Sequence, residues 1–374
     1  MRIAIAGGGL GGLTLARILH RHGIDAVVYE REESRSARPQ GGMLDLHPES
    51  GQQALAEAGL AGQFRSQARP EGEEHRILDP AGRTLVHHVP QPGSFSGRPE
   101  IDRTALRDLL LDSLPGDTVV WRHRLVAATP RPDEGWELTF DGGHRTGCDI
   151  LIGADGARSA VRSLLTDVQL SYVATLVELN ISDVDRRHPD LADLVGPGNL
   201  WCVGVNQILA AQRLGDGRLR VGISLRADDR PIDTYRSKRA LLDMFGGWDP
   251  RLTALIEAGD GAPAPRLIEA MPTGTRWASR PGITLIGDAA HLMPPVGEGA
   301  NQAMLDAAEL ASQLAANPAD PDSAIRTYEG AMFTRAHLIA EMSERVQAMM
   351  LSPTAAEDIV RFFTARPAEP APAD

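Results

Sequence analysis

The chain has 374 residues, a length that exceeds one ordinary hydrophobic core and predicts two domains or one enlarged α/β unit. With 42% hydrophobic and 24% charged residues, its composition is typical of a soluble globular protein. The formal net charge of −12 argues against an unaided nucleic-acid or anionic-membrane partner, because phosphate binding requires a basic surface.

The cysteines and the hydropathy exclude further classes. Cys148 and Cys202 are too few for a disulfide framework, and no Cys-x-x-Cys or Cys/His cluster indicates a metal site. No stretch approaches the roughly 20 apolar residues of a membrane span. The strand predicted at residues 2–6 leaves no room for a signal peptide. We therefore expect a cytoplasmic protein with no metal, nucleic-acid or membrane partner. We also expect it to be a monomer that acts on a small molecule.

The first part of the chain alternates strands and helices. A strand over 2–6, a helix over 10–23 and a strand over 26–29 are typical of the opening of a doubly wound parallel sheet. A polar, arginine-bearing loop over 32–42 follows. The same periodicities predict a hairpin over 74–89, a helix over 101–114 and strands over 118–121, 136–140 and 149–154.

The pattern changes after about residue 165. Alternating or apolar runs over 170–184, 200–205, 207–214 and 218–225, with the hairpin signal Asp216-Gly217, predict an antiparallel sheet inserted in the first domain. The α/β pattern returns with a strand over 283–286. A long amphipathic helix is predicted over 325–351, and the Pro/Ala-rich tail over 364–374 is expected to be flexible.

The first chemical signal is the glycine run at residues 7–12, which satisfies G-x-G-x-x-G between a strand and a helix. Gly7 permits the tight turn, Gly9 lets a pyrophosphate approach the backbone, and Gly12 lets helix and strand pack closely. The helix N-terminus then offers N–H groups to phosphates. A glycine turn that binds nothing is the alternative, and the context on both sides argues against it.

Glu30 closes the second strand, 18 residues after Gly12. Its carboxylate can accept hydrogen bonds from an adenosine ribose and would repel a 2′-phosphate, which favours FAD or NAD over NADP as the resident nucleotide. Arg31 leaves this point open, because an arginine could hold such a phosphate.

Two later strand ends carry aspartates. Gly287-Asp288 ends a strand and enters a helix, so Asp288 could bond a ribityl hydroxyl while the helix N-terminus faces a flavin pyrimidine. A plain NAD dehydrogenase has no use for this element, and it therefore favours FAD. Asp155-Gly156 follows another buried strand, with Arg158, Ser159 and Arg162 after it.

These three motifs, in this order, resemble the class A flavoprotein monooxygenases typified by para-hydroxybenzoate hydroxylase. Other segments are similar to the tetracycline-inactivating branch of that family, over nearly the whole chain: Gly41-Gly42-Met43-Leu44-Asp45-Leu46-His47, Ser50-Gly51-Gln52, Pro99-Glu100-Ile101-Asp102-Arg103, Trp248-Asp249-Pro250-Arg251 and Gly287-Asp288-Ala289-Ala290-His291-Leu292-Met293-Pro294-Pro295.

The resemblance implies an α/β fold, in which a Rossmann-like FAD-binding domain carries an inserted antiparallel-sheet substrate domain and a long C-terminal bridging helix. The FAD-binding domain is expected to comprise residues 1–70, 98–165 and 268–320, and the substrate domain residues 71–97 and 166–267. The bridging helix is expected at 321–352.

The resemblance also implies site roles. FAD contacts are expected from Gly7, Gly9, Leu10, Gly12, Glu30, Arg31, Asp45, Arg103, Asp288, Pro295 and Gly299, and an NADPH contact from Arg38. The alternatives are a solvated charge for Arg38, Arg158 or Arg162, and a turn residue for Asp45. His291 is expected to be a packed structural histidine.

The implied reaction needs no catalytic side chain. NADPH reduces FAD, the reduced flavin reacts with O2 to a C4a-hydroperoxide, and the distal oxygen passes to an electron-rich enol or aromatic carbon. No second G-x-G-x-x-G is present, so NADPH is expected to bind transiently. Nothing in the sequence indicates Asp155 or Glu298 as a general base.

The substrate positions depart from the tetracycline branch. A glutamine and a histidine of that branch align with Glu178 and Arg220, a further arginine aligns with Asn199, and the loop after Pro295 is shorter. Glu178 and Arg220 would either present charges to the substrate or pair across neighbouring strands. The leading substrate is a tetracycline-like polycyclic compound. The alternatives are another phenolic or polyketide metabolite, a non-catalytic flavin-containing drug-binding protein, or an NAD dehydrogenase. A halogenase is disfavoured because the W-x-W-x-I-P signature is missing.

Overall fold

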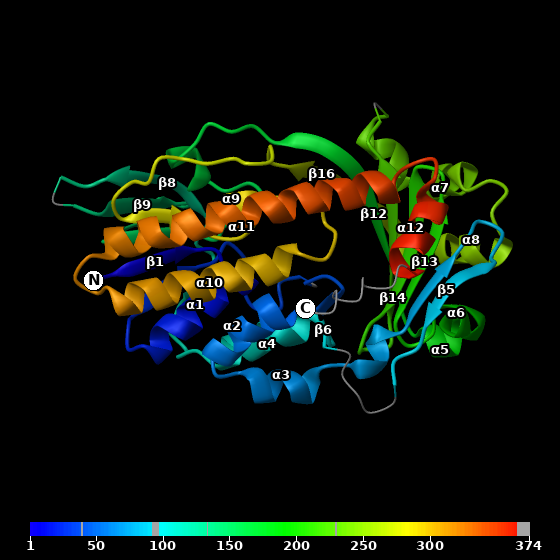
Figure 1. Ribbon diagram of the computed structural model, residues 1–374, viewed down its shortest axis with the longest axis horizontal. Helices are drawn as coiled ribbons and strands as arrows, with labels where there is room; N and C mark the ends of the chain where they lie inside the picture. The colour runs from blue at the N-terminus through cyan, green and yellow to red at the C-terminus, as the bar shows by residue number, and fades with distance from the viewer. Residues whose placement is uncertain (39, 92–96, 133, 229, 365–374) are drawn as a thin grey trace, which may run out of the picture. The chain divides into compact units, whose positions relative to one another are not determined.

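The computed structural model describes residues 1–38, 40–91, 97–132, 134–228 and 230–364. The chain divides into two compact units (Figure 1). Unit 1 comprises Met1–Pro70, Pro92–Tyr172 and Glu269–Glu344, and unit 2 comprises Glu71–Gln91, Val173–Ile268 and Arg345–Asp374. Except for Thr364, the tail predicted over 364–374 lies outside the described residues.

Unit 1 is built on a five-stranded parallel sheet in the order β17-β11-β1-β2-β7. Every residue of β1 and β11 is buried, as expected of parallel strands that are covered on both faces. The strands are β1 (Ile3–Ala6), β2 (Ala26–Tyr29), β7 (Val119–Val120), β11 (Ile150–Gly153) and β17 (Ile283–Leu285).

The helices of unit 1 bury their apolar residues in one core with this sheet. On α1, Leu13, Leu15, Ile18 and Leu19 are inaccessible to solvent, which is the amphipathic pattern that the sequence predicts. The helices are α1 (Leu10–Arg21), α2 (Gln53–Glu57), α3 (Ala61–Gln67), α4 (Arg103–Asp112), α9 (Asp288–His291) and α10 (Gly299–Ala316).

Two smaller sheets complete unit 1. One is three-stranded, with β8 (Leu125–Pro130), β9 (Trp136–Phe140) and β10 (Arg145–Cys148). The other pairs β3 (Met43–Asp45) with β6 (Glu100–Asp102) in antiparallel register. The predicted helix over 101–114 is therefore shorter than expected, because Ile101 and Asp102 belong to β6 and α4 starts at Arg103.

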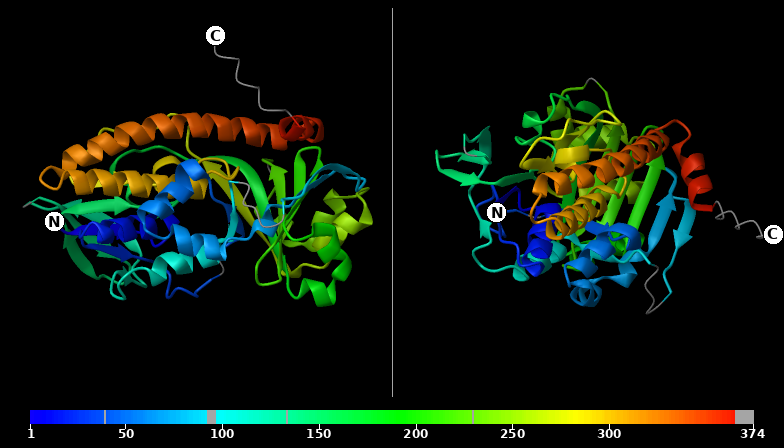
Figure 2. Two further views of the ribbon diagram at one scale, coloured as in Figure 1. Left: turned by 60° about the horizontal axis from the view of Figure 1, so that its bottom comes forward. Right: turned by 60° about the vertical axis from the view of Figure 1, so that its left-hand side comes forward.

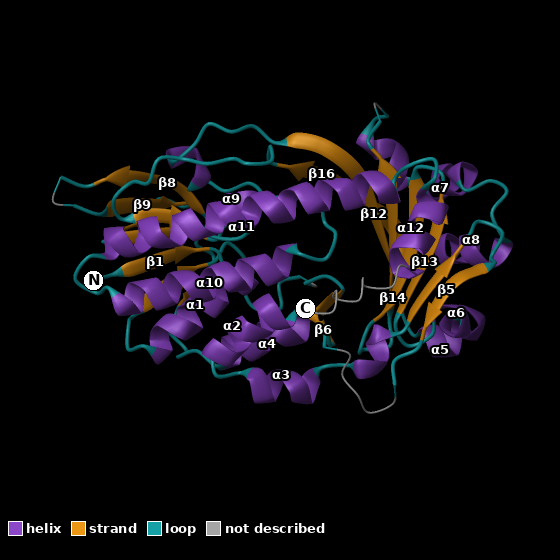
Figure 3. Ribbon diagram, in the orientation of Figure 1, coloured by secondary structure: helices purple, strands orange, loops and turns teal. Residues whose placement is uncertain are grey.

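Unit 2 contains a seven-stranded sheet in the order β16-β12-β15-β14-β13-β4-β5, coloured orange in Figure 3. The pairing of β13 with β4 is parallel, and the pairs β12–β15, β15–β14, β14–β13 and β4–β5 are antiparallel. The strands are β4 (His75–Leu78), β5 (Thr84–His88), β12 (Ser171–Ile181), β13 (Asn199–Gly204), β14 (Gln207–Arg213), β15 (Leu219–Arg226) and β16 (Asp260–Ala270).

Each face of this sheet has its own apolar cluster. Alternate residues such as Val177, Leu179 and Val221 pack with α5 (Val184–Arg187), α6 (Pro189–Val195), α7 (Lys238–Met244) and α8 (Pro250–Glu257). Ile77, Val203 and Ile208 belong to a second cluster, with Ala355 and Ile359 of α12 (Ala355–Thr364). The sequence does not predict α12, which begins just after Pro353.

The long C-terminal helix is α11 (Pro321–Met350), close to the predicted 325–351 (Figure 2). It is divided between the units, with residues through Glu344 in unit 1 and residues from Arg345 in unit 2. The predicted fold class is thus confirmed. Among the described helices, none combines the length and the apolar character that crossing a bilayer would require.

Candidate functional site

The glycine turn lies between β1 and α1. Gly7 has a φ of +110°, and a Cβ there would lie 2.3 Å from the Ala154 carbonyl oxygen. A Cβ on Gly12 would lie 2.1 Å from the Gly7 carbonyl oxygen, so both glycines are required by close approach of the backbone. A Cβ on Gly9 would meet no protein atom within 4 Å. Gly9 therefore leaves open space at the start of α1, where Leu10 is the first helical residue.

Glu30 follows β2, and its side chain hydrogen-bonds to the glycine turn. Its carboxylate is buried and accepts hydrogen bonds from the backbone N–H groups of Gly8 (2.6 Å) and Glu32 (2.9 Å). A carboxylate oxygen can accept more than one hydrogen bond, so Glu30 retains capacity for a ligand hydroxyl. Arg31, beside it, is exposed.

Arg107 is a site residue that sequence reasoning missed. It lies one helical turn after Arg103 on α4, and it is 3% exposed. Its guanidinium donates to the carbonyl oxygens of Gly8 and Arg35, both at 3.2 Å, and forms an ion pair with Glu32 at 3.0 Å. It thereby ties the glycine turn to the loop that follows β2. Its i, i+4 spacing from Arg103 is the only signal that could have indicated it.

Arg38 is held at the end of that loop. Its Nε lies 2.5 Å from Oε1 of Glu32, whose other oxygen faces Arg107. The side chain of Arg38 is still 55% exposed. Arg38 is therefore more than a solvated charge, because its guanidinium pairs with Glu32 and is still accessible to solvent.

The Gly287-Asp288 turn follows β17. Gly287 has a φ of +60° and donates its N–H to the buried Asp306 carboxylate at 2.8 Å. Asp288 is exposed, and a Cβ on Gly299 would lie 3.7 Å from its Oδ1. Because α9 has only four residues, the substantial helix N-terminus beside Asp288 is that of α10, whereas the sequence pattern indicated the helix directly after the strand. Pro295 lies exposed in the connection between these two helices.

Ala303 of α10 brings the two motifs together. A Cβ on Gly11 would lie 3.0 Å from the Ala303 carbonyl oxygen, and a Cβ on Gly287 would lie 2.7 Å from the Ala303 Cβ. In the sheet, β1 and β17 are separated by β11 alone, roughly 10 Å apart. Both motifs follow carboxyl ends of parallel strands, next to the switch in strand order between β1 and β11, where α/β sheets bind nucleotides. The described residues therefore fit one extended dinucleotide.

Asp45 belongs to a polar cluster rather than to a turn, because it ends strand β3. Its Oδ2 lies 2.9 Å from Nε2 of His47, and Nδ1 of His47 lies 3.6 Å from Oε1 of Glu298. Burial disfavours the charged imidazole, but the hydrogen bond and charge of Asp45, together with Glu298, outweigh it and raise the pKa of His47. Asn301 donates to the Asp45 carbonyl oxygen at 2.9 Å and accepts from the His47 N–H at 3.0 Å. The sequence did not single out His47 or Asn301.

The Asp155 turn has a different use. Oδ2 of Asp155 accepts hydrogen bonds from the N–H groups of Ala160 (2.7 Å) and Val161 (3.4 Å), so it holds the turn that follows β11. Arg162 is buried and donates to carbonyl oxygens of Ala157, Asp288 and Ala289. The solvated-charge alternative is therefore wrong for Arg162, whereas it fits Arg158, which is largely exposed and 3.5 Å from Glu269.

The three predicted substrate residues lie in unit 2. Glu178 on β12 and Arg220 on β15 form an ion pair, and Nε of Arg266 lies 3.4 Å from the other oxygen of Glu178. Pairing across neighbouring strands, the alternative above, is thus realised. Asn199 is buried and donates to the Gly72 carbonyl oxygen at 3.1 Å, which is a structural use of its amide.

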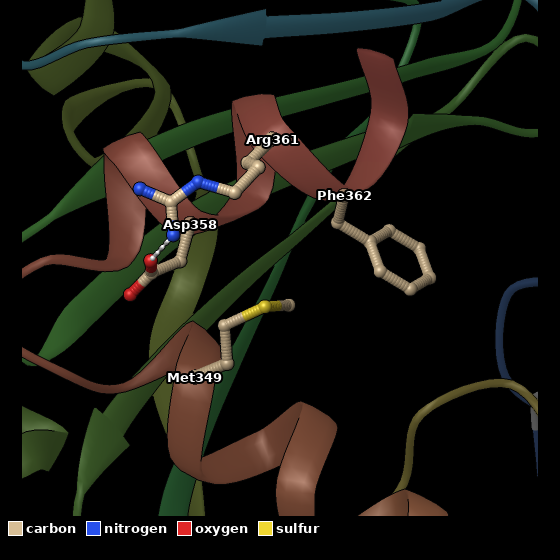
Figure 4. A pocket seen from close by; sticks show the side chains of 4 residues that line it. All are labelled: Met349, Asp358, Arg361 and Phe362. Atoms are coloured by element: carbon tan, nitrogen blue, oxygen red, sulfur yellow. Dashed lines mark hydrogen bonds and ion pairs between the residues drawn. The ribbon is translucent and has the colours of Figure 1, made fainter. Parts of the chain in front are cut away.

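A separate pocket in unit 2 lies between the end of α11 and α12 (Figure 4). Met349, Asp358, Arg361 and Phe362 line it, and Asp358 pairs with Arg361 at 3.1 Å. None of these residues was predicted to be functional. Among the described residues no group of three or more His, Cys, Asp or Glu side chains could hold a metal ion.

Comparison with known proteins agrees with the geometry of unit 1. A family model described as "FAD binding domain" matches residues 1–208 and 272–342. The chain is 30% identical over 369 residues to monooxygenase penA of Penicillium thymicola, covering 84% of each chain. It is 31% identical over 343 residues to 3-amino-4-hydroxybenzoate 2-monooxygenase PtnB3 of Streptomyces platensis, covering 88% of this chain and 83% of that one.

Among solved structures, the tetracycline destructase Tet(51) superposes with a TM-score of 0.74 at 19% identity, covering 96% of this chain and 95% of that one. At that identity the match shows a shared fold.

Proposed function

The chain belongs to the FAD binding domain family and is an FAD-dependent monooxygenase, and from this premise we propose that it hydroxylates an electron-rich enol or aromatic carbon of a tetracycline-like polycyclic compound, with NADPH as hydride donor. The observation that supports the FAD-dependent part of the proposal is the close approach of one residue, Ala303, to both Gly11 of the glycine turn and Gly287 of the Gly287-Asp288 turn. A single cofactor can then be held at both ends.

The residues of unit 1 have defined parts in holding FAD. Glu30 would accept from the adenosine ribose, and the start of α1 with Arg103 would bind the pyrophosphate. Asp288 would accept from the ribityl chain, and Asp45 with the N-terminus of α10 would face the flavin end. When bound, FAD supplies hydride acceptance and the activation of dioxygen. The protein orients it and excludes water from it.

Arg38 is the residue proposed for NADPH. Its exposed guanidinium offers donors to an anionic cofactor, and Glu32 and Arg107 fix the loop that carries it. The described residues supply one glycine turn of the nucleotide-binding type, and it is assigned to FAD. Arg38 would therefore hold NADPH only transiently at the surface, and NADPH would supply the hydride.

A second substrate class is favoured by a specific observation. Arg220 and Arg266 both pair with Glu178 in unit 2, so this cluster presents guanidinium groups that are suited to an anion. A phenolate or carboxylate substrate would complement it, and PtnB3 is by its name a hydroxybenzoate monooxygenase. The alternative is therefore a hydroxylase of an anionic phenolic metabolite.

The test is a substrate panel with the purified holoenzyme. NADPH oxidation, oxygen consumption and incorporation of labelled oxygen into product are measured with tetracyclines and with hydroxybenzoates. Stimulation by a tetracycline with oxygen incorporation supports the leading proposal, and stimulation by hydroxybenzoates alone supports the alternative. Tight binding of a tetracycline without NADPH consumption would overturn the enzymatic proposal in favour of a drug-binding protein.

We also propose that the enzyme works as a cytoplasmic monomer. The net charge of −12 supports a protein that stays in solution without nucleic acid. Light scattering on the purified holoenzyme tests the state of association, and a mass twice that of the chain would contradict it.

A further inference from the structure

The groups buried beneath the Gly287-Asp288 turn centre on Asp306 of α10. Its carboxylate is 0% exposed and accepts from the Gly287 N–H at 2.8 Å, from Nε2 of His291 at 2.6 Å and from Nη2 of Arg335 at 2.5 Å. His291 is the packed histidine that the sequence analysis expected. The carboxylate of Asp306 therefore fixes the backbone of the turn directly.

Arg335 of α11 extends this group along α10. Its Nε donates to the side-chain oxygen of Gln302 at 3.0 Å, and its Nη1 lies 2.6 Å from Glu309. Figure 1 shows α11 running alongside α10 in unit 1. One guanidinium thus contacts three successive positions on one side of α10: Gln302, Asp306 and Glu309.

The contacts continue from Gln302 to the Asp45 cluster. The Gln302 amide donates to Oε2 of Glu298 at 3.3 Å, and Oε1 of Glu298 faces Nδ1 of His47 at 3.6 Å. His47 then contacts Asp45 at 2.9 Å. Glu298, the N-cap of α10, and Gln302 and Asp306 within the helix are spaced by four residues. They therefore lie on the same face of α10.

These contacts form a path from Asp306 through Arg335, Gln302, Glu298 and His47 to Asp45. The charges of the ionisable groups alternate in sign along this path. Asp306 and Glu298 are acidic, Arg335 and His47 are basic, and the Gln302 amide presents its oxygen to the cation and its nitrogen to the anion. Burial opposes the charged forms, but the mutual attraction outweighs it, so the pKa of His291 is raised and that of Asp306 is lowered. A buried ion pair does not by itself stabilise a fold strongly, but it can fix the geometry of the segments that it contacts.

We propose that Glu298, Gln302, Asp306 and Arg335 form a positioning network that couples the Asp288 turn to the Asp45–His47 cluster, so that the two segments facing FAD hold one geometry. The inference rests on the proposed function of these segments. Arg335 and Gln302 contact neither Asp45 nor Asp288, so they act through other residues.

The first experiment compares two variants of the holoenzyme. Arg335→Gln removes the cation at the centre of the path. Arg326→Gln removes an exposed arginine of the same helix and serves as the matched control. Flavin release on dilution is followed by the rise in flavin fluorescence. We expect Arg335→Gln to speed release about tenfold or more, and Arg326→Gln to change it by less than about twofold.

The second experiment tests coupling itself and does not depend on how Arg335→Gln folds. Flavin release is measured for His47→Asn, Asp288→Asn and the double variant, first in the native background and then with Gln302→Met, which breaks the path in the middle without leaving a buried charge. In the native background, we expect the change in release rate of the double variant to differ by about threefold or more from the product of the changes in the two single variants. With Gln302→Met, we expect the change in the double variant to equal that product.

The outcomes separate the two hypotheses. Independent effects in the native background, or coupling that persists with Gln302→Met, overturn the network while FAD binding stands. A native protein that binds no flavin overturns the proposed function instead. A merely structural role would lower the melting temperature of the variants without producing coupling in the release rates.

Discussion

At the scale of single residues, the site depends on where a side chain is absent. Gly7 and Gly12 are required by the backbone itself, since a Cβ on either would overlap a carbonyl oxygen. Gly9 is different: its φ of −79° suits any residue, and no protein atom lies within 4 Å of its Cβ position. Folding thus has no use for a glycine at this position, whereas a close ligand does.

This difference predicts opposite outcomes for two alanine variants. Gly9→Ala is expected to keep the melting temperature of the flavin-free protein within a few degrees while weakening FAD binding about tenfold or more, because the methyl group occupies the approach to the pyrophosphate. Gly12→Ala is expected to destabilise the fold itself by more than about 2 kcal/mol. Fluorescence titration with FAD and thermal unfolding distinguish them. Undiminished FAD affinity in Gly9→Ala would contradict the assignment.

At the scale of elements, the sheet of unit 2 carries two charge-dependent contacts. Glu178 on β12 pairs with Arg220 on β15, two residues out of direct register on neighbouring strands. On β4, His75 packs edge-on against Trp201 and stacks on Phe363 of α12. The first contact bears on the proposed choice of substrate, and the second bears on how stably α12 packs against the sheet.

Replacing Glu178 tests the choice between the two substrate classes. Glu178→Gln removes the carboxylate that pairs with Arg220 and Arg266, so KM for an anionic phenol is expected to fall about tenfold, by the roughly 1.5 kcal/mol of a hydrogen bond to a charged group. KM for an uncharged polycyclic substrate should rise or stay unchanged. Glu137→Gln, at an exposed ion pair with Arg145 in unit 1, is the control. A rise in KM for the anion would contradict the second candidate function.

His75 predicts how stability depends on pH. Burial lowers the pKa of His75 from 6.5 to about 4. Between pH 4 and pH 6.5, the imidazole is therefore mostly protonated in the unfolded chain and mostly neutral in the folded chain. The free energy of unfolding is therefore expected to fall as pH drops from 6.5 to about 4, by up to about 3 kcal/mol, and the contribution is complete above 6.5. Urea unfolding across this range should lose that slope in His75→Asn and keep it in His20→Asn, a change at an exposed position of α1.

At the scale of the whole molecule, the proposed roles divide between the two units. Every residue proposed to contact FAD lies in unit 1, and Glu178, Arg220 and Asn199 lie in unit 2. Hydrogen exchange followed by mass spectrometry should therefore show FAD slowing exchange at residues 7–12 and 287–299, because a ligand that binds the folded state suppresses local opening. Slowing confined to the strands of unit 2 would contradict the division.

Local patterns predicted the parts of unit 1 that are continuous in sequence. The glycine turn, Glu30 and Asp288 each stand directly after an apolar strand, so their place at the sheet edge follows from the strand pattern. The remaining site residues depend on distant partners: Asn301 contacts His47 across 254 positions and Arg107 contacts Gly8 across 99. Periodicity carries no information on such contacts. The ten-residue α12 was missed because its apolar residues face a sheet formed by distant segments.

The small side chain of Ala303 affects the distance between the two segments proposed to bind the ends of FAD. Its carbonyl oxygen lies close to Gly11 of α1 and its methyl group lies close to Gly287 after β17, so this small residue contributes to the spacing of the two FAD-binding segments. A longer side chain would force the two ends apart at a cost of roughly 1–3 kcal/mol, since close-packed interiors do not absorb added volume. The spacing of the two FAD-binding segments thus depends in part on a residue of α10, and changing it offers a route to cofactor analogues of altered length.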